Sequence, residues 1–195
     1  TGLSTIKTVG HNLVDAIIEE RQNGEFKSFE DFIMRITSSD TANMNKKACE
    51  ALILSGALDG LGLNRAQMIA VYLEMIDRFS KVGKENILGQ EDMFSMTGDD
   101  EYTFDIPDIP EFPKRDFLRN EKEYLGVYIT DHPYSPYEQL VSDRVNFTTA
   151  DIINEYEIWD KKPVIFGGII TGVNQILTRK NDNMAFLTIE DIYGS

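Results

Sequence analysis

The chain has 195 residues, of which 42% are hydrophobic, and a formal net charge of −14. This length suits one large domain or two small ones, and no apolar run approaches the ~20 residues of a membrane helix. A single cysteine excludes an internal disulfide framework. One cysteine and two histidines also form no sequence spacing typical of metal ligands. No phosphate loop, nucleophile elbow or pair of catalytic carboxylates is present, so no catalytic residue is assigned, and we expect a cytoplasmic protein with no membrane partner.

The negative charge is concentrated in the middle of the chain. Residues 89–160 hold 5 basic and 18 acidic side chains, whereas residues 1–88 hold 10 basic and 12 acidic ones. The last stretch, residues 161–195, is close to neutral. The middle third therefore repels a polyanion, while both ends remain free to meet one.

The first elements, in residues 3–18, have the pattern of two helices joined by a tight turn. Apolar residues stand at positions 3 and 6 and again, with helical spacing, at 13, 16 and 17. Gly10 can adopt a positive φ, and Asn12 is a suitable N-cap for a helix that starts near His11. This pattern resembles a helix-hairpin-helix, whose turn binds a phosphate oxygen through backbone amides. The alternative is an ordinary helical hairpin. The expected DNA contacts are Lys7, Thr8, Val9, Gly10, His11 and Asn12.

A second copy of the pattern follows an amphipathic helix that begins after Ser28, with Asp31 at the capping-box position. Asn45 caps a helix that Gly56 ends, and a further helix starts at Asn64. Gly60 and Gly62 let backbone amides approach a phosphate. Two such hairpins grip a duplex across its minor groove without reading its sequence. The expected contacts in the second copy are Gly60, Leu61, Gly62, Asn64 and Arg65.

Residues 89–113 form an acidic linker that contains a short apolar pair. Its most informative part is the pentapeptide Gln90, Glu91, Asp92, Met93 and Phe94. Two adjacent large apolar side chains in a solvated segment indicate a peptide that docks into a groove on another protein.

The last elements are two β-branched segments, Val164–Ile176 and Met184–Asp191, joined by a polar turn. Glycines within the first segment predict a bulge or sharp coil, as at the corner of a small barrel of the OB type. Arg179 and Lys180 in the turn are candidates for binding single-stranded nucleic acid. A hairpin with a solvated basic tip is the alternative.

The ordered series of motifs resembles the C-terminal half of the bacterial replicative DNA polymerase III alpha subunits, the C-family polymerases. The series comprises the hairpin pair, the pentapeptide 90–94, the run Glu121–Tyr128, the triplet Asp131–Pro133 and the strand Met184–Asp191. The resemblance implies that the hairpins bind primer-template duplex, that the pentapeptide docks on the sliding clamp, and that an OB domain lies near the template strand. Single-stranded template DNA and other replisome subunits are further implied partners. The palm carboxylates that bind catalytic Mg²⁺ are expected upstream, so no cofactor is expected in this chain.

The predicted fold is mainly α, a tandem helix-hairpin-helix followed by a β hairpin or partial OB barrel, and thus α+β. The expected parts are a duplex-binding domain (1–88), the linker with its clamp peptide (89–113), a connecting helical region (114–160) and the first strands of an OB-fold (161–195). Two alternatives stay open: a DNA-binding subunit of a repair or nuclease complex, and an acidic interaction scaffold that does not bind DNA.

Overall fold

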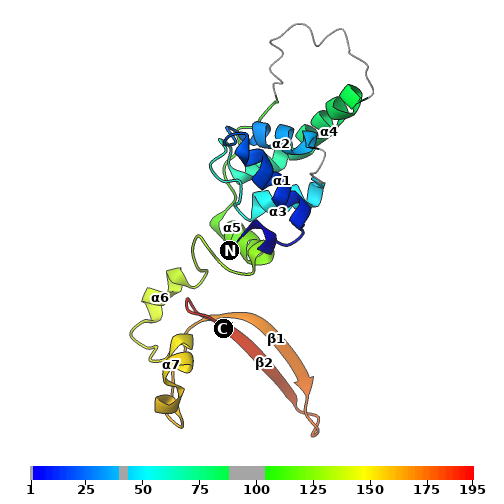
Figure 1. Cartoon of the computed structure of the whole chain (residues 1–195). Coiled ribbons are helices and arrows are strands. Elements are labelled where there is room, and N and C mark those ends of the chain that lie inside the picture. The colour runs from blue at the N-terminus through cyan, green and yellow to red at the C-terminus, as the bar shows by residue number, and fades with distance from the viewer. Residues whose placement is uncertain (1, 40–43, 88–103) are drawn as a thin grey trace. The chain divides into compact units, whose positions relative to one another are not determined.

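The computed structural model of the chain describes residues 2–39, 44–87 and 104–195. These residues form helices and a two-stranded antiparallel sheet, which confirms the predicted α+β class (Figure 1). The chain divides into two compact units, Thr1–Tyr128 and Ile129–Ser195. Within the described residues, no helix combines the length and the apolar character needed to cross a bilayer.

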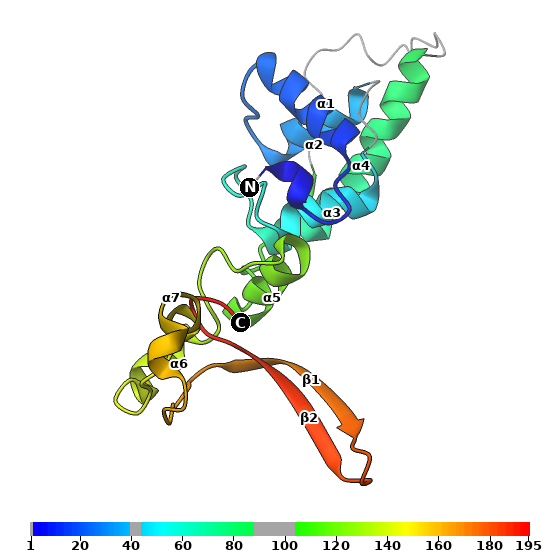
Figure 2. The same ribbon diagram turned by 60° about the horizontal axis from the view of Figure 1, so that its bottom comes forward.

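The first unit is helical. Its core is made mainly by apolar side chains of α1, α2, α3 and α4, and the four helices are grouped together in both Figure 1 and Figure 2. The largest of the fully buried side chains include Phe29, Phe32, Leu52, Met68 and Met75. The elements are η1 (Leu3–Thr5), α1 (His11–Gln22), α2 (Phe29–Ser38), α3 (Lys46–Leu54), α4 (Arg65–Ile87) and α5 (Lys114–Leu125).

The predicted caps of α2 and α3 are confirmed. The Ser28 hydroxyl accepts a hydrogen bond from the Asp31 amide at 3.1 Å, and the Asn45 side chain accepts one from the Ala48 amide at 2.8 Å. The predicted cap of α1 is wrong. Gly10 is the N-cap and Asn12 lies inside the first turn, so no side chain caps this helix.

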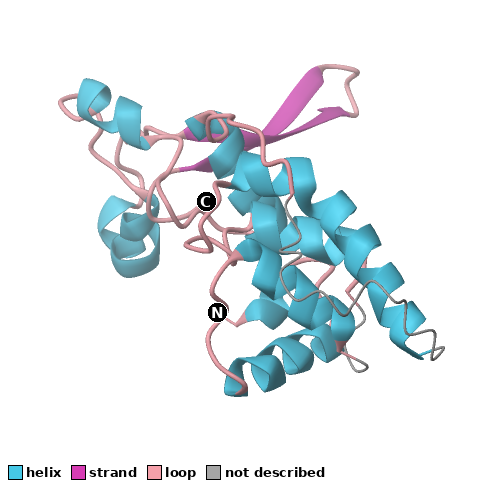
Figure 3. Cartoon of the chain, turned by 90° about the horizontal axis from the view of Figure 1, so that it is seen from above, coloured by secondary structure: helices cyan, strands magenta, loops and turns pink. Residues whose placement is uncertain are grey.

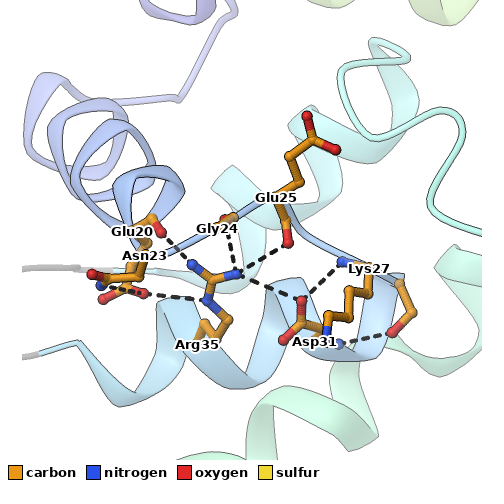
Figure 4. Close-up of polar contacts among 8 residues, drawn as sticks. Glu20, Asn23, Gly24, Glu25, Lys27, Asp31 and Arg35 are labelled. Atoms are coloured by element: carbon orange, nitrogen blue, oxygen red, sulfur yellow. Dashed lines mark hydrogen bonds and ion pairs between the residues drawn. The ribbon is translucent and has the colours of Figure 1, made fainter.

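Arg35 fixes the connection between α1 and α2 (Figure 4). Its guanidinium forms ion pairs with Glu20 at 3.3 Å and Asp31 at 3.6 Å, and it donates a hydrogen bond to the Gly24 carbonyl at 3.2 Å. It also lies over the Phe26 ring, 4.5 Å from the centroid. The loop that joins the two helices therefore wraps around one cation.

The observed division of the chain differs from the predicted parts. Residues 114–160 were expected to form one connecting region, but α5 packs against α3 and belongs to the first unit. Leu118 and Glu121 on one side of α5 are buried. Sequence pattern alone did not reveal this packing because α5 is rich in charged residues.

The second unit contains α6 (Ser135–Val141), α7 (Thr149–Trp159), β1 (Ile169–Leu177) and β2 (Asn183–Glu190). The two antiparallel strands form the magenta hairpin of Figure 3. Their register shifts between Ile170 and Gly172, as expected for a bulge at a glycine. Barrel strands beyond β1 and β2 are not among the described residues, so the OB-fold stays a prediction.

The first strand begins at Ile169, later than the predicted Val164, and Gly167 and Gly168 lie before it in closely packed surroundings. A Cβ at Gly168 would stand 2.8 Å from the Glu190 carbonyl oxygen, and one at Gly167 would stand 2.3 Å from the Tyr134 hydroxyl. These two glycines thus permit close approach of neighbouring segments rather than bending the strand.

Asp191 joins the end of β2 to the beginning of α7. Its buried carboxylate accepts hydrogen bonds from the Thr149 amide at 2.7 Å, the Thr149 hydroxyl, the Tyr193 amide at 2.9 Å and the Gly194 amide at 3.0 Å. Burial raises the pKa of Asp191, but these hydrogen bonds outweigh it and hold the pKa below its usual 3.8.

We predict that Asp191→Asn lowers the free energy of unfolding of the second unit by about 2 kcal/mol at pH 7. Because the pKa is lowered on folding, the ionised carboxylate stabilises the unit above the ordinary aspartate pKa. This stabilisation disappears as the pH falls through the lowered value, so the variant and the parent chain should converge in acid. Urea unfolding followed by the fluorescence of Trp159, the single tryptophan, measures this difference. Asp160→Asn, at an exposed position, should change little; equal stability of Asp191→Asn and the parent at pH 7 would contradict the assignment.

Candidate nucleic-acid-binding site

The first turn, between η1 and α1, is anchored in the core by two apolar side chains. Ile6 and Val9 are buried, whereas Lys7, Thr8 and Gly10 are exposed. The left-handed residue of the turn is Thr8, with a φ of 68°, and not Gly10, whose φ is −80°. The prediction of a positive φ at Gly10 is therefore wrong. Val9 lies in the core, so only its backbone remains as a candidate contact.

The amides at the beginning of α1 face no acceptor among the described residues. Leu13 and Val14 donate to the Gly10 carbonyl at 3.1 and 3.2 Å, but no such bond is made by the amides of His11 and Asn12. Both residues are exposed, and a Cβ built at Gly10 meets nothing within 4 Å. The helix N-terminus therefore presents two free donors and a partial positive charge to solvent.

Lysines flank this turn. The Thr8 hydroxyl donates to the Lys47 carbonyl at 3.3 Å, so the first turn lies beside the beginning of α3. Lys7 and Lys47 are both exposed, while the neighbouring Lys46 forms an ion pair with Asp77 at 2.8 Å. Lys47 was not singled out in the sequence, because only the tertiary contact through Thr8 brings it to the turn.

The second turn, between α3 and α4, has the predicted local geometry. Gly60 and Gly62 have φ values of 91° and 89°, and nothing lies within 4 Å of a Cβ at either position. Asn64 and Gln67 form the expected capping box, with the Gln67 amide donating to Asn64 at 2.8 Å and the Asn64 amide donating to Gln67 at 3.1 Å. The Leu61 carbonyl accepts from the Phe29 amide at 2.9 Å, which ties this turn to α2.

The amides at the beginning of α4 are already bound by a carboxylate of the chain. Glu111 accepts from the Arg65 amide at 2.9 Å and from the Ala66 amide at 3.2 Å. The Asn64 side-chain amide also donates to the Ile109 carbonyl at 2.9 Å. The two turns thus differ at the helix that follows each: the amides at the beginning of α1 are open, and those at the beginning of α4 are occupied by Glu111. Glu111 carries no sequence signal that distinguishes it from the other acids of its segment.

Arg65 is occupied inside the fold. Its side chain is 4% exposed, and its guanidinium contacts Asp59 at 2.6 Å and Glu121 at 3.7 Å. It also donates to the Leu54 carbonyl at 3.2 Å and lies 3.7 Å from the Phe117 ring centroid. The structure assigns Arg65 to this buried network rather than to the phosphate contact that the sequence predicted.

The remaining predicted residues lie elsewhere. The pentapeptide Gln90–Phe94 lies outside the described residues. Arg179 and Lys180 are exposed in the turn between β1 and β2, which the Thr178 amide closes by donating to the Asp182 carbonyl at 2.9 Å. In the part of the chain that the structure describes, no three His, Cys, Asp or Glu side chains gather as metal ligands.

We predict that Arg65→Ala lowers the free energy of unfolding of the first unit by about 3 kcal/mol, since it removes the buried cation that pairs with Asp59 and Glu121. Urea unfolding followed by circular dichroism at 222 nm measures the loss. Arg119→Ala removes an exposed arginine from α5 and serves as the control, with an expected change below about 0.5 kcal/mol. If Arg65→Ala unfolds like the parent chain and loses only DNA affinity, Arg65 is a DNA contact after all.

Comparison with known proteins identifies the same motif in the sequence. The helix-hairpin-helix motif family matches residues 1–68, which include both turns. The chain is similar to DNA polymerase III subunit alpha of Borreliella burgdorferi, with 34% identity over the whole chain. It is also similar to the proteins of that name from Xylella fastidiosa, at 33% identity, and Vibrio cholerae, at 31%, over 99% of the chain in both cases. The chain spans 16–17% of the length of these relatives.

Proposed function

Because the chain belongs to the DNA polymerase III alpha subunit family, we propose that it is the part of a cytoplasmic replicative DNA polymerase that holds primer-template duplex and docks on the sliding clamp. The observation that carries this proposal is the open N-terminus of α1. Its amides lie next to a turn whose conformation is fixed by two side chains buried in the core.

The first turn is suited to bind a phosphate of the DNA backbone. The amides of His11 and Asn12 donate to a phosphate oxygen, and the absence of a side chain at Gly10 lets the backbone come close. Lys7 and Lys47 add positive charge on flexible side chains. Donors of this kind contact only the backbone of the DNA, so binding is independent of base sequence and weakens with salt.

The clamp-binding peptide is proposed to be Gln90–Phe94, in which Met93 and Phe94 are the apolar anchors. The described residues on either side of it are held at α4. This helix runs to Ile87, and Phe104 packs against Phe79 of the same helix, with ring centroids 5.7 Å apart. The described residues before and after this segment therefore both meet the same helix.

Nucleotidyl transfer is proposed for the whole protein, with Mg²⁺ bound by carboxylates upstream of this chain. The described residues do not fit that metal, because no cluster of three ligand-type side chains occurs among them. No catalytic step is therefore assigned to them. Arg179 and Lys180 are proposed contacts for the single-stranded template, and other replisome subunits are further proposed partners.

We predict that Gly10→Asp changes stability and DNA binding in opposite directions. An aspartate at the N-cap of α1 satisfies the free amides and should raise the free energy of unfolding by a few tenths of a kcal/mol. The same carboxylate occupies the phosphate site, so duplex affinity should fall about tenfold. Fluorescence anisotropy with a labelled duplex, at two salt concentrations, measures the affinity.

Gln22→Glu is the matched control for this experiment, because it adds one negative charge at the exposed opposite end of the same helix. It should weaken duplex binding much less than Gly10→Asp. Failure of the parent chain to bind duplex contradicts the role proposed for the first turn. If the two variants bind equally, the first turn is not the phosphate site.

For the clamp, we predict that Met93→Ala combined with Phe94→Ala abolishes binding to the sliding clamp, since each anchor of this kind contributes roughly 2 kcal/mol or more. Thermal unfolding and duplex affinity should stay unchanged. A pull-down with purified clamp measures the effect, and Ser95→Ala with Met96→Ala is the control for loss of a neighbouring apolar side chain. Retention of the clamp by the Met93 and Phe94 double variant would show that docking occurs elsewhere.

A further inference from the structure

Glu111 binds the backbone amides at the beginning of α4. These amides are the counterparts of the open amides at the beginning of α1. We propose that the Glu111 carboxylate is an internal competitor of DNA phosphate, so that the amides at the beginning of α4 are closed to DNA until residues 107–111 leave them. This inference rests on the proposed function, because it assumes that the hairpin turns bind duplex.

The geometry of the carboxylate is that of a bound anion. Its two oxygens each accept one of two successive backbone amides, from Arg65 at 2.9 Å and from Ala66 at 3.2 Å. One of them also accepts the Phe112 amide at 2.8 Å. Two oxygens of a DNA phosphate can accept the same pair of helix N-terminal amides, and the partial positive charge of the helix favours either anion.

The segment around Glu111 is held by further hydrogen bonds from the same turn of α4. The Asn64 side chain donates to the Ile109 carbonyl at 2.9 Å, and the Gln67 side chain donates to the Pro107 carbonyl at 3.1 Å. Both donors belong to the capping box, so the residues that begin the helix also bind the segment that covers it. These hydrogen bonds are only partly buried, so water or DNA oxygens can replace the acceptors.

Charge near the second turn acts in the same direction. Asp108 and Glu111 make the covering segment, residues 107–111, acidic, while Arg65 is engaged by Asp59 and Glu121. A phosphate that approaches the beginning of α4 therefore meets the Glu111 carboxylate, while the Arg65 guanidinium is already paired. At the first turn it meets Lys7 and Lys47.

The test compares duplex affinities of the full chain and of three variants by fluorescence anisotropy at two salt concentrations. Glu111→Ala removes the competing anion, and Glu111→Gln removes its charge while keeping an acceptor. Asp108→Ala is the matched control, because it removes one exposed charge from the same segment. We expect Glu111→Ala to bind about tenfold more tightly than the parent chain, Glu111→Gln to lie between them, and Asp108→Ala to change affinity less than twofold.

Hydrogen exchange at the Ala66 amide gives an independent readout. In the parent chain this amide should be protected without DNA; in Glu111→Ala it should exchange faster and become protected again when duplex is added. A fast exchange at Ala66 that duplex does not slow would overturn the inference. If Glu111→Ala is too unstable to assay, Glu111→Gln takes its place in the test. Equal duplex affinities of Glu111→Gln and Asp108→Ala would then overturn the inference.

The outcomes separate this inference from the proposed function. Duplex binding by the parent chain with no gain in either Glu111 variant leaves the proposed function intact and refutes only the role of Glu111. No duplex binding by the parent chain or by any variant refutes both. Binding that appears only in the Glu111 variants supports the competition directly.

Discussion

The organisation of the first unit depends on the buried guanidinium of Arg65. A cation removed from water is costly unless it is paired and hydrogen-bonded, and Arg65 obtains its partners from three places: Asp59 in the second turn, the Leu54 carbonyl at the end of α3, and Glu121 on α5. Gly56 makes this possible, because a Cβ there would stand 2.0 Å from the guanidinium. One side chain thus sets the position of the second turn and of α5 together.

In two places in this chain, a carboxylate binds the backbone amides at a helix N-terminus. Such an N-terminus is no longer available to an external anion. Glu111 binds the beginning of α4 and Asp191 binds the beginning of α7, each through backbone amides that lie more than forty residues away in sequence. The beginning of α1 has no such partner among the described residues. Because a helix N-terminus with free donors attracts anions, the beginning of α1 offers a phosphate less competition than the beginning of α4 or α7.

The acidic middle of the chain therefore has two roles that composition alone does not separate. Its net negative charge disfavours the approach of any polyanion, whereas Glu111 acts at one point by occupying the donors of α4. The same stretch returns the chain to α4, where Phe104 packs against Phe79. The surface of the first unit is thus shaped by a segment that the sequence identifies only as a linker.

The sequence by itself determined the features that depend on neighbouring residues. The caps at Ser28, Asn45 and Asn64 and the positive φ of Gly60 and Gly62 follow from interactions within about four residues, so their patterns are visible along the chain. Tertiary structure decided the rest. Thr8 takes the left-handed position of the first turn, Arg65 is buried by α5, and Glu111 closes α4 from 46 residues away. These outcomes depend on which distant segments pack together, and one charged side chain in a charged sequence does not reveal its partner before the chain has folded.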